Sequence, residues 1–272
     1  MERHLDALCA RETGMENPDI LLTNDDGIDA TGLHALYEAL RSVGSVTVVA
    51  PAEDHSAAGR TLSSSVGLRE HDLGYVVEGT PVDCVLAGLQ SLCPETDLVV
   101  AGCNQGANLG SAVLGRSGTV STAVEAAFLG IPAIAVSMYI PAAAFDNGDP
   151  GLDQAAYASA VDATTHLVAG AGDLDIFERA DYLNINAPIA SRCTGEMVVT
   201  RPSELYRKTA TRDGETVTIR DPIWGAMESG STADPAGTDR HAIVENRISV
   251  SPLSATHTTA DDPELVRLAD TY

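Results

Sequence analysis

Two neighbouring carboxylates, Asp25 and Asp26, are the side chains of this sequence best suited to hold a metal ion. Adjacent carboxylates repel each other unless they share a cation or a proton. A turn with a helix-capping acid would also account for the pair alone, but polar residues follow two further predicted strands, Ser56 and Asn104. Carboxylate, amide and hydroxyl oxygens suit Mg²⁺ or Mn²⁺. We therefore predict one divalent cation per subunit, bound by these four residues.

Two glycine-containing segments follow the third predicted strand and are candidates for binding phosphate. Residues 106–110 form a loop with a glycine at each end, and the run Ser117-Gly118-Thr119 opens a predicted helix. Free backbone N–H groups and the helix dipole attract anions at such a position. Each signal is weak alone, since Ser117 serves equally well as a plain helix cap. The sequence has no Walker A loop, and no G-x-G-x-x-G follows the first strand.

Other hydrolase chemistries find little support in the sequence. There is no G-x-S-x-G nucleophile elbow, and the seven histidines form no H-x-x-x-H pair that would suggest zinc. Phosphatases of the haloacid dehalogenase type need Asp-x-Asp, whereas Asp25 and Asp26 are contiguous. His55, next to Ser56, is expected to lie in a solvated loop, and its role stays open.

Alternating strand and helix patterns predict the elements that position these residues. Since β-α-β units give parallel strands and ligands bind beyond the carboxyl ends of such strands, the polar residues should share one edge of a sheet. We predict an α/β, Rossmann-like, doubly wound and mostly parallel domain over 19–195, after a polar, disordered leader over 1–18. A smaller β-rich segment with a hairpin and a C-terminal helix should follow over 196–272. The predicted strands are 20–23, 46–50, 97–101, 131–137 and 182–185, with a hairpin at 66–77, helices at 30–43, 80–92, 117–129, 152–169 and 263–270, and short β runs at 198–200, 217–219 and 243–250.

The charge balance of the chain is strongly acidic. Its 39 acidic and 16 basic residues give a formal net charge of −23, and Lys208 is the single lysine. Such self-repulsion becomes tolerable near 1 M salt, where the screening length falls to about 3 Å, so we predict a halophilic protein. The deficit of Lys and Arg argues against nucleic acid or an anionic membrane as a partner, and no apolar run approaches the roughly 18 residues of a membrane span. Five cysteines without a C-x-x-C pair favour a reduced, cytoplasmic location.

Taken together, these segments resemble the SurE family of survival-protein nucleotidases, in the family's order from about 19 to 255. The resemblance implies a Rossmann-like fold and Mg²⁺- or Mn²⁺-dependent hydrolysis of nucleoside monophosphates at the 5′ or 3′ position. It also implies a C-terminal part that forms homodimers or homotetramers. Many members have Tyr where this chain has Arg116, and Pro where it has Ala107, and 205–235 shows little likeness. The matching runs are ILLTNDDG (20–27), VVAP (48–51) with Ser56, GTPVDCV (79–85), Gly102 with Asn104, NLG (108–110), SGTV (117–120), LNIN (183–186), GTD (237–239) and SVSPL (249–253).

The same resemblance assigns roles to individual residues. The family's metal ligands fall on Asp25, Asp26, Ser56 and Asn104, and its phosphate contacts fall on Asn108, Ser117, Gly118 and Thr119. Asp25 is the predicted catalytic residue, which either attacks phosphorus or activates a water molecule. Two alternatives of other classes are a nucleotide-binding regulator without turnover and a structural oligomer. Neither would need the complete ligand set that this sequence retains.

Overall fold

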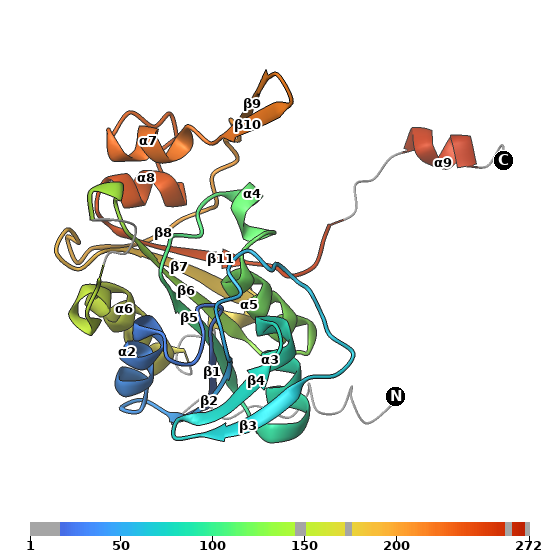
Figure 1. The fold of residues 1–272 in the computed structure, drawn as a ribbon, viewed down its shortest axis with the longest axis vertical. Helices are drawn as coiled ribbons and strands as arrows, with labels where there is room; N and C mark the ends of the chain where they lie inside the picture. Colours follow the sequence, from blue (N-terminus) through green and yellow to red (C-terminus); the bar gives the residue numbers. More distant parts are fainter. Residues whose placement is uncertain (1–16, 145–150, 172–175, 259–262, 270–272) are drawn as a thin grey trace.

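One mostly parallel sheet of nine strands forms the centre of the computed structural model, which describes residues 17–144, 151–171, 176–258 and 263–269 (Figure 1). Pairing is parallel from β4 through β7, while β3 and β11 run antiparallel to β4 and β7. In sheet order the strands are β3 (Gly67–His71), β4 (Gly74–Glu78), β2 (Ser45–Pro51), β1 (Asp19–Thr23), β5 (Leu98–Asn104), β6 (Ala133–Tyr139), β7 (Tyr182–Pro188), β11 (Ile248–Leu253) and β8 (Met197–Val199).

Helices cover both faces of this sheet, which confirms the predicted α/β, doubly wound class. Strand β1 shows how the sequence produces the two layers, because successive side chains of a strand point to opposite faces. Ile20 and Leu22 pack in the core beside Leu36 of α2, whereas Leu21 packs in the second core beside Val85 of α3. The helices of the first layer are α2 (Thr31–Leu40) and α6 (Ala158–Gly170), and those of the second are α3 (Pro81–Ala87) and α5 (Gly118–Phe128).

Most predicted elements are present, and three differ. The predicted helix 152–169 is a 3-10 turn, Gln154–Tyr157, followed by α6. The predicted helix 80–92 is α3 followed by a π-helical turn, Gly88–Leu92, and it begins with a capping box between Thr80 and Asp83. The predicted β run 243–250 is wrong at its start, because Ile243 and Val244 end helix α8 (Asp239–Val244). Ile243 is buried with Leu109, so tertiary packing overrides the β preference of branched residues. The shorter elements are α4 (Ser111–Leu114) and 3-10 turns at Ala142–Ala144, Gln154–Tyr157 and Ile176–Glu178.

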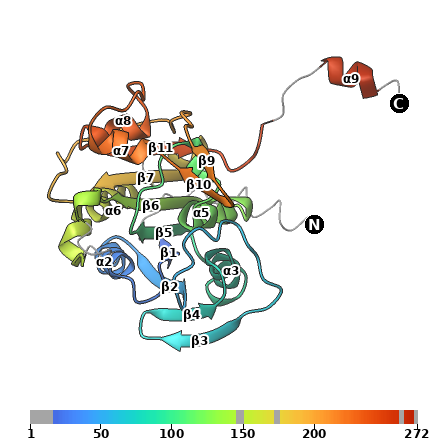
Figure 2. The same cartoon turned by 45° about the horizontal axis from the view of Figure 1, so that its top comes forward.

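The chain after residue 195 is divided between the main sheet and outlying elements. Strands β8 and β11 extend the sheet beyond β7, although the predicted division placed them in the smaller segment. A separate antiparallel hairpin, β9 (Thr209–Asp213) and β10 (Thr216–Arg220), projects at the top of Figure 1 and comes to the front of the sheet in Figure 2. Helix α7 (Ile223–Glu228) lies beside α8. Helix α9 (Pro263–Ala269) lies away from the sheet at the end of an arm. Nearly all of the predicted leader 1–18 lies outside the described residues. Over the described ranges, every helix is too short or too polar to cross a bilayer.

Candidate metal and phosphate site

The acid pair lies at the carboxyl edge of the sheet, directly after β1 and between the loops that follow β2 and β5. Those two strands flank β1, so their loops reach the pair from either side. The His55 amide donates to the Asp25 carbonyl oxygen at 2.8 Å, and the Gln105 amide donates to Asp26 Oδ2 at 3.0 Å. The turn itself is closed by Asn24 Nδ2, which donates to the Gly27 carbonyl at 2.8 Å. The structure therefore brings together the three strand ends that carry the predicted ligands.

Asp25 also contacts the start of helix α5. Its side chain is 3 % exposed, and its Oδ1 accepts a 2.6 Å hydrogen bond from the Thr119 hydroxyl. A Cβ atom added to Gly118 would lie 2.6 Å from Asp25 Oδ2, so only glycine permits this approach. Ser117 caps the helix by accepting from the Val120 amide at 3.1 Å. The carboxylate thus lies beside a helix end whose first-turn amides lack intrahelical partners.

Burial raises the pKa of both carboxylates above its usual value. Desolvation raises the pKa of Asp25, and the Thr119 hydroxyl opposes this only in part. Desolvation and the neighbouring Asp25 charge raise the pKa of Asp26 to about 7, against the lowering effect of the Gln105 amide. The nearby Asp54 charge raises both values further. Such a pair holds either a proton or a cation near neutral pH, which fits the chemistry of a divalent-metal site.

The other two predicted ligands lie beside the pair but have local partners. The Ser56 hydroxyl and amide both donate to Asp54 Oδ1, at 2.6 and 2.7 Å, and both residues are exposed. Asn104 Nδ2 donates to the Gly106 carbonyl at 2.5 Å. Within the described ranges, no three His, Cys, Asp or Glu side chains converge as a metal cluster. A cation here would therefore depend on serine, amide and water oxygens besides Asp25 and Asp26. Sequence reasoning gave no role to Asp54, although it lies two residues before Ser56.

Asn108 is fixed in place by a buried set of polar side chains. It is 6 % exposed, its amide donates to Asn186 Oδ1 at 2.8 Å, and its carbonyl accepts from Asn184 and Asn186 at 3.0 Å each. Its Nδ2 donates to Ser137 Oγ at 2.9 Å and to Thr119 Oγ1 at 3.5 Å. A continuous path of hydrogen bonds therefore joins Asn108 to Asp25 through Thr119. The roles of Ser137, Asn184 and Asn186 were not predicted, although asparagines in an apolar strand were a visible signal.

Arg116, which departs from the family pattern, lies at the surface beside this region. Its Nη2 is 3.3 Å from the Tyr206 hydroxyl, and its guanidinium carbon is 5.7 Å from the centroid of the Tyr206 ring. Both side chains are exposed. An arginine and a tyrosine from distant parts of the chain thus meet one residue before the capping Ser117.

The elevated pKa of Asp26 predicts how pH affects the metal-free protein. The folded state retains the Asp26 proton up to about pH 7, whereas the unfolded state releases it near 3.8. The folded state then binds more protons in that window, so the free energy of unfolding should fall as pH rises through it. Asp26→Asn removes this loss. In EDTA and molar KCl, the variant should gain stability relative to wild type between about pH 4 and 7, and the difference should level off above. Thermal melts measure this, with exposed Asp72→Asn as the control; a difference that is constant with pH would contradict it.

The fold and the site define a doubly wound α/β protein with a candidate metal and phosphate site at the carboxyl edge of its sheet. The family described as survival protein SurE matches residues 20–209, and the chain belongs to this family. A relative from Haloarcula marismortui named 5'-nucleotidase SurE is 57 % identical, and the match covers 95 % of this chain and 96 % of the relative. One of the same name from Geobacter sulfurreducens is 39 % identical, covering 86 % and 87 %. The solved SurE protein from Aquifex aeolicus superposes with a TM-score of 0.77 at 30 % identity, covering 93 % and 100 %. The resemblance read from the sequence is confirmed.

Proposed function

We propose that this protein is a divalent-metal-dependent phosphatase that hydrolyses nucleoside monophosphates to nucleoside and inorganic phosphate. The observation that carries the proposal is the contiguous pair of a buried Asp25, held against the N-terminus of α5 by the Thr119 hydroxyl, and a half-buried Asp26. The name 5'-nucleotidase, shared by relatives that match almost the whole chain, supports the same activity. A regulator that binds nucleotides without turnover would have no need for two adjacent, mutually repelling carboxylates at this position.

The chain's own groups divide the work as follows. Asp25, Asp26, Ser56 and Asn104 would hold Mg²⁺ or Mn²⁺, which when bound supplies positive charge against the charge that develops on the phosphoryl oxygens. The Thr119 hydroxyl holds Asp25 Oδ1, which supports Asp25 as the catalytic carboxylate. It would act either on phosphorus or on a water molecule. Phosphate would be held at the start of α5, at Gly118 and Thr119, with Ser117 and the Asn108 side chain beside it. The Ser117 amide itself donates to the Val113 carbonyl at 3.1 Å, so Ser117 would contribute through its hydroxyl.

A substrate panel with defined metals tests this proposal. Purine and pyrimidine 5′- and 3′-monophosphates are incubated in molar KCl with Mn²⁺, Mg²⁺ or EDTA, and released phosphate is measured. We expect turnover with at least one cation and none with EDTA. If nucleotides bind but no phosphate is released under any metal condition, the protein is a nucleotide-binding regulator and not an enzyme. Hydrolysis at the same rate in EDTA would contradict the proposed metal dependence.

We also propose that the protein is a cytoplasmic homodimer or homotetramer assembled through its C-terminal elements. Val217 and Ile219 on β10, and Leu265, Val266 and Leu268 on α9, expose large apolar side chains on elements that lie away from the sheet. The cysteines of the described residues are all free, which suits a reducing compartment. Light scattering in molar KCl should give at least the mass of a dimer. A monomer at micromolar concentration would exclude this assembly, and Val217→Ser with Ile219→Ser should lower the mass if β10 is the contact.

A further inference from the structure

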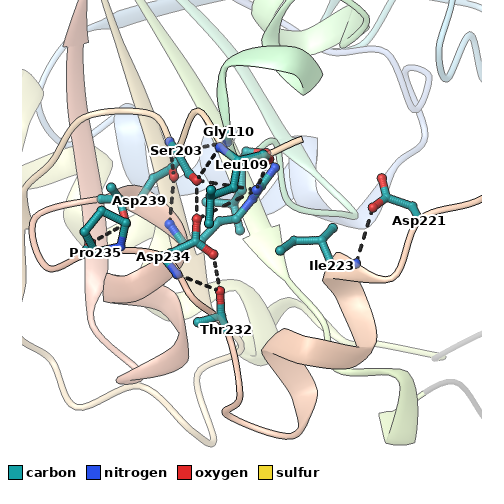
Figure 3. Close-up of polar contacts among 12 residues, drawn as sticks. Leu109, Gly110, Ser203, Asp221, Ile223, Thr232, Asp234, Pro235 and Asp239 are labelled. Carbon is teal, nitrogen blue, oxygen red and sulfur yellow. Dashed lines mark hydrogen bonds and ion pairs between the residues drawn. The ribbon is translucent and has the colours of Figure 1, made fainter. Parts of the chain in front are cut away.

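A second buried polar cluster lies away from the acid pair, between helix α8 and the loop that precedes α4 (Figure 3). Its charged members are Asp234, Asp239 and Arg240, each no more than 5 % exposed, and Ser203 is buried with them. Buried charges are expensive to desolvate and survive only where partners satisfy them. The hydrogen-bond partners of these side chains therefore show which segment of the protein they stabilise.

The cluster makes hydrogen bonds to the backbone of the loop before α4, at Leu109 and Gly110. Asp239 Oδ2 accepts from the Gly110 amide at 2.6 Å, and its Oδ1 accepts from the Ser203 amide at 2.9 Å. The Arg240 guanidinium donates to the Leu109 carbonyl at 3.2 Å and to the Leu205 carbonyl at 2.8 Å. Asp234 Oδ1 lies 3.8 Å from Arg240 Nη1 and offsets its charge. Two adjacent residues of α8 thus hold the carbonyl of Leu109 and the amide of Gly110.

The segment so held is the one that carries Asn108. Leu109 is fully buried against Met227 and Ile243, and a Cβ atom on Gly110 would lie 2.3 Å from the Arg240 guanidinium. On the other side, Asn184 and Asn186 bind the backbone of Asn108. The loop is therefore clamped by β7 at Asn108 and by α8 at the next two residues. Loss of either clamp would free the backbone on one side of Asn108.

We propose that Asp239 and Arg240 are positioning residues that keep Asn108 in place beside Thr119, at the proposed phosphate site. The inference rests on the proposed phosphate role of Asn108. The two residues touch no reacting atom; they act through the backbone of Leu109 and Gly110. Their loss should therefore weaken phosphate binding, while metal binding, which depends on residues after β1, β2 and β5, should be retained.

The test compares Asp239→Asn, Arg240→Lys and Arg240→Gln with wild type in molar KCl and Mn²⁺. We expect KM for a nucleoside monophosphate and Ki for inorganic phosphate to rise about tenfold or more in Asp239→Asn and Arg240→Gln. The Mn²⁺ concentration for half-activation should change less than twofold. Arg240→Lys keeps the charge beside Asp234 but not the planar fork of donors, so its values should lie between wild type and Arg240→Gln. It also serves as the test if a harsher variant does not fold.

Thr232→Val is the matched control, because the Thr232 hydroxyl donates to Asp234 on the side of the cluster away from the loop. This variant should melt lower but keep wild-type KM and Ki. The same pattern in Asp239→Asn, a lower melting temperature with unchanged KM and Ki, would overturn the proposal and make the cluster purely structural. Unchanged values in Asn108→Ala would overturn it as well, yet leave the nucleotidase activity standing. If the wild-type protein hydrolyses no nucleotide, phosphate binding is measured by thermal shift instead. Weaker phosphate binding in Asp239→Asn would then support the positioning role, while the proposed nucleotide substrate would be wrong.

Discussion

Asp25→Asn and Asp26→Asn are each expected to lower phosphate release by about a hundredfold or more, the scale seen when one preorganised electrostatic group is removed from an active site. Each substitution removes a carboxylate that the cation requires. Neither should unfold the protein, because both residues lie in a turn at the end of β1 that accepts Asn. In EDTA the variants should be at least as stable as wild type, since one of two adjacent like charges is gone.

Metal linkage gives the same experiment a second readout. Wild type should gain thermal stability when Mn²⁺ is added, by about 2.7 kcal/mol at a hundredfold excess over Kd, and both variants should gain less. Asp29→Asn is the matched control, because Asp29 is an exposed acid three residues farther along the same turn. Phosphate release and melting temperature are measured for all four proteins with and without Mn²⁺. Full activity in either site variant would remove the metal-phosphatase interpretation and favour the nucleotide-binding regulator.

The edge of the sheet where the site lies could be predicted because it depends on local patterns. The apolar run before Asp25, the helical spacing after it and the apolar run before Pro51 together define a β-α-β unit, and parallel pairing then fixes which strand ends share an edge. The same reasoning placed Ser56 and Asn104 near the pair without any knowledge of contacts. Register along β1 is fixed by the two cores, since a slip of one residue would exchange the layers against which Leu21 and Leu22 pack.

The groups that support the site could not be predicted in this way, because their partners are distant in the sequence. Asp239 and Arg240 reach residues about 130 positions earlier, and Asn186 reaches Asn108 across 78. Sequence patterns show that such residues are polar, but their burial depends on how β7 and α8 pack. The strand predicted at 243–250 was wrong at its start for the same reason, since contact of Ile243 with Leu109 decides its conformation.

Salt is expected to decide whether the fold forms at all. A chain with a net charge of −23 repels itself over about 10 Å at 0.1 M salt, but over only about 3 Å at 1 M. Ion pairs such as Arg41 with Glu38 and Arg69 with Glu78 lie at the surface and offset little of this charge. The substrate is an anion and is repelled by the same field. Melting temperature and phosphate release should both rise steeply as KCl increases from 0.1 M towards molar concentrations.

A charge-reduced variant separates screening from other effects of salt. Glu70 and Asp72 are exposed on β3 and its turn, at the edge of the sheet away from the site. Glu70→Gln with Asp72→Asn changes the net charge from −23 to −21 and touches neither the acid pair nor the loops around it. If repulsion sets the salt requirement, this variant should reach half of its maximal melting shift at a lower KCl concentration than wild type. A stability curve that is flat from 0.1 M to molar KCl in wild type would refute halophilic adaptation. An unchanged midpoint in the variant would instead show that screening of the net charge does not set the salt requirement.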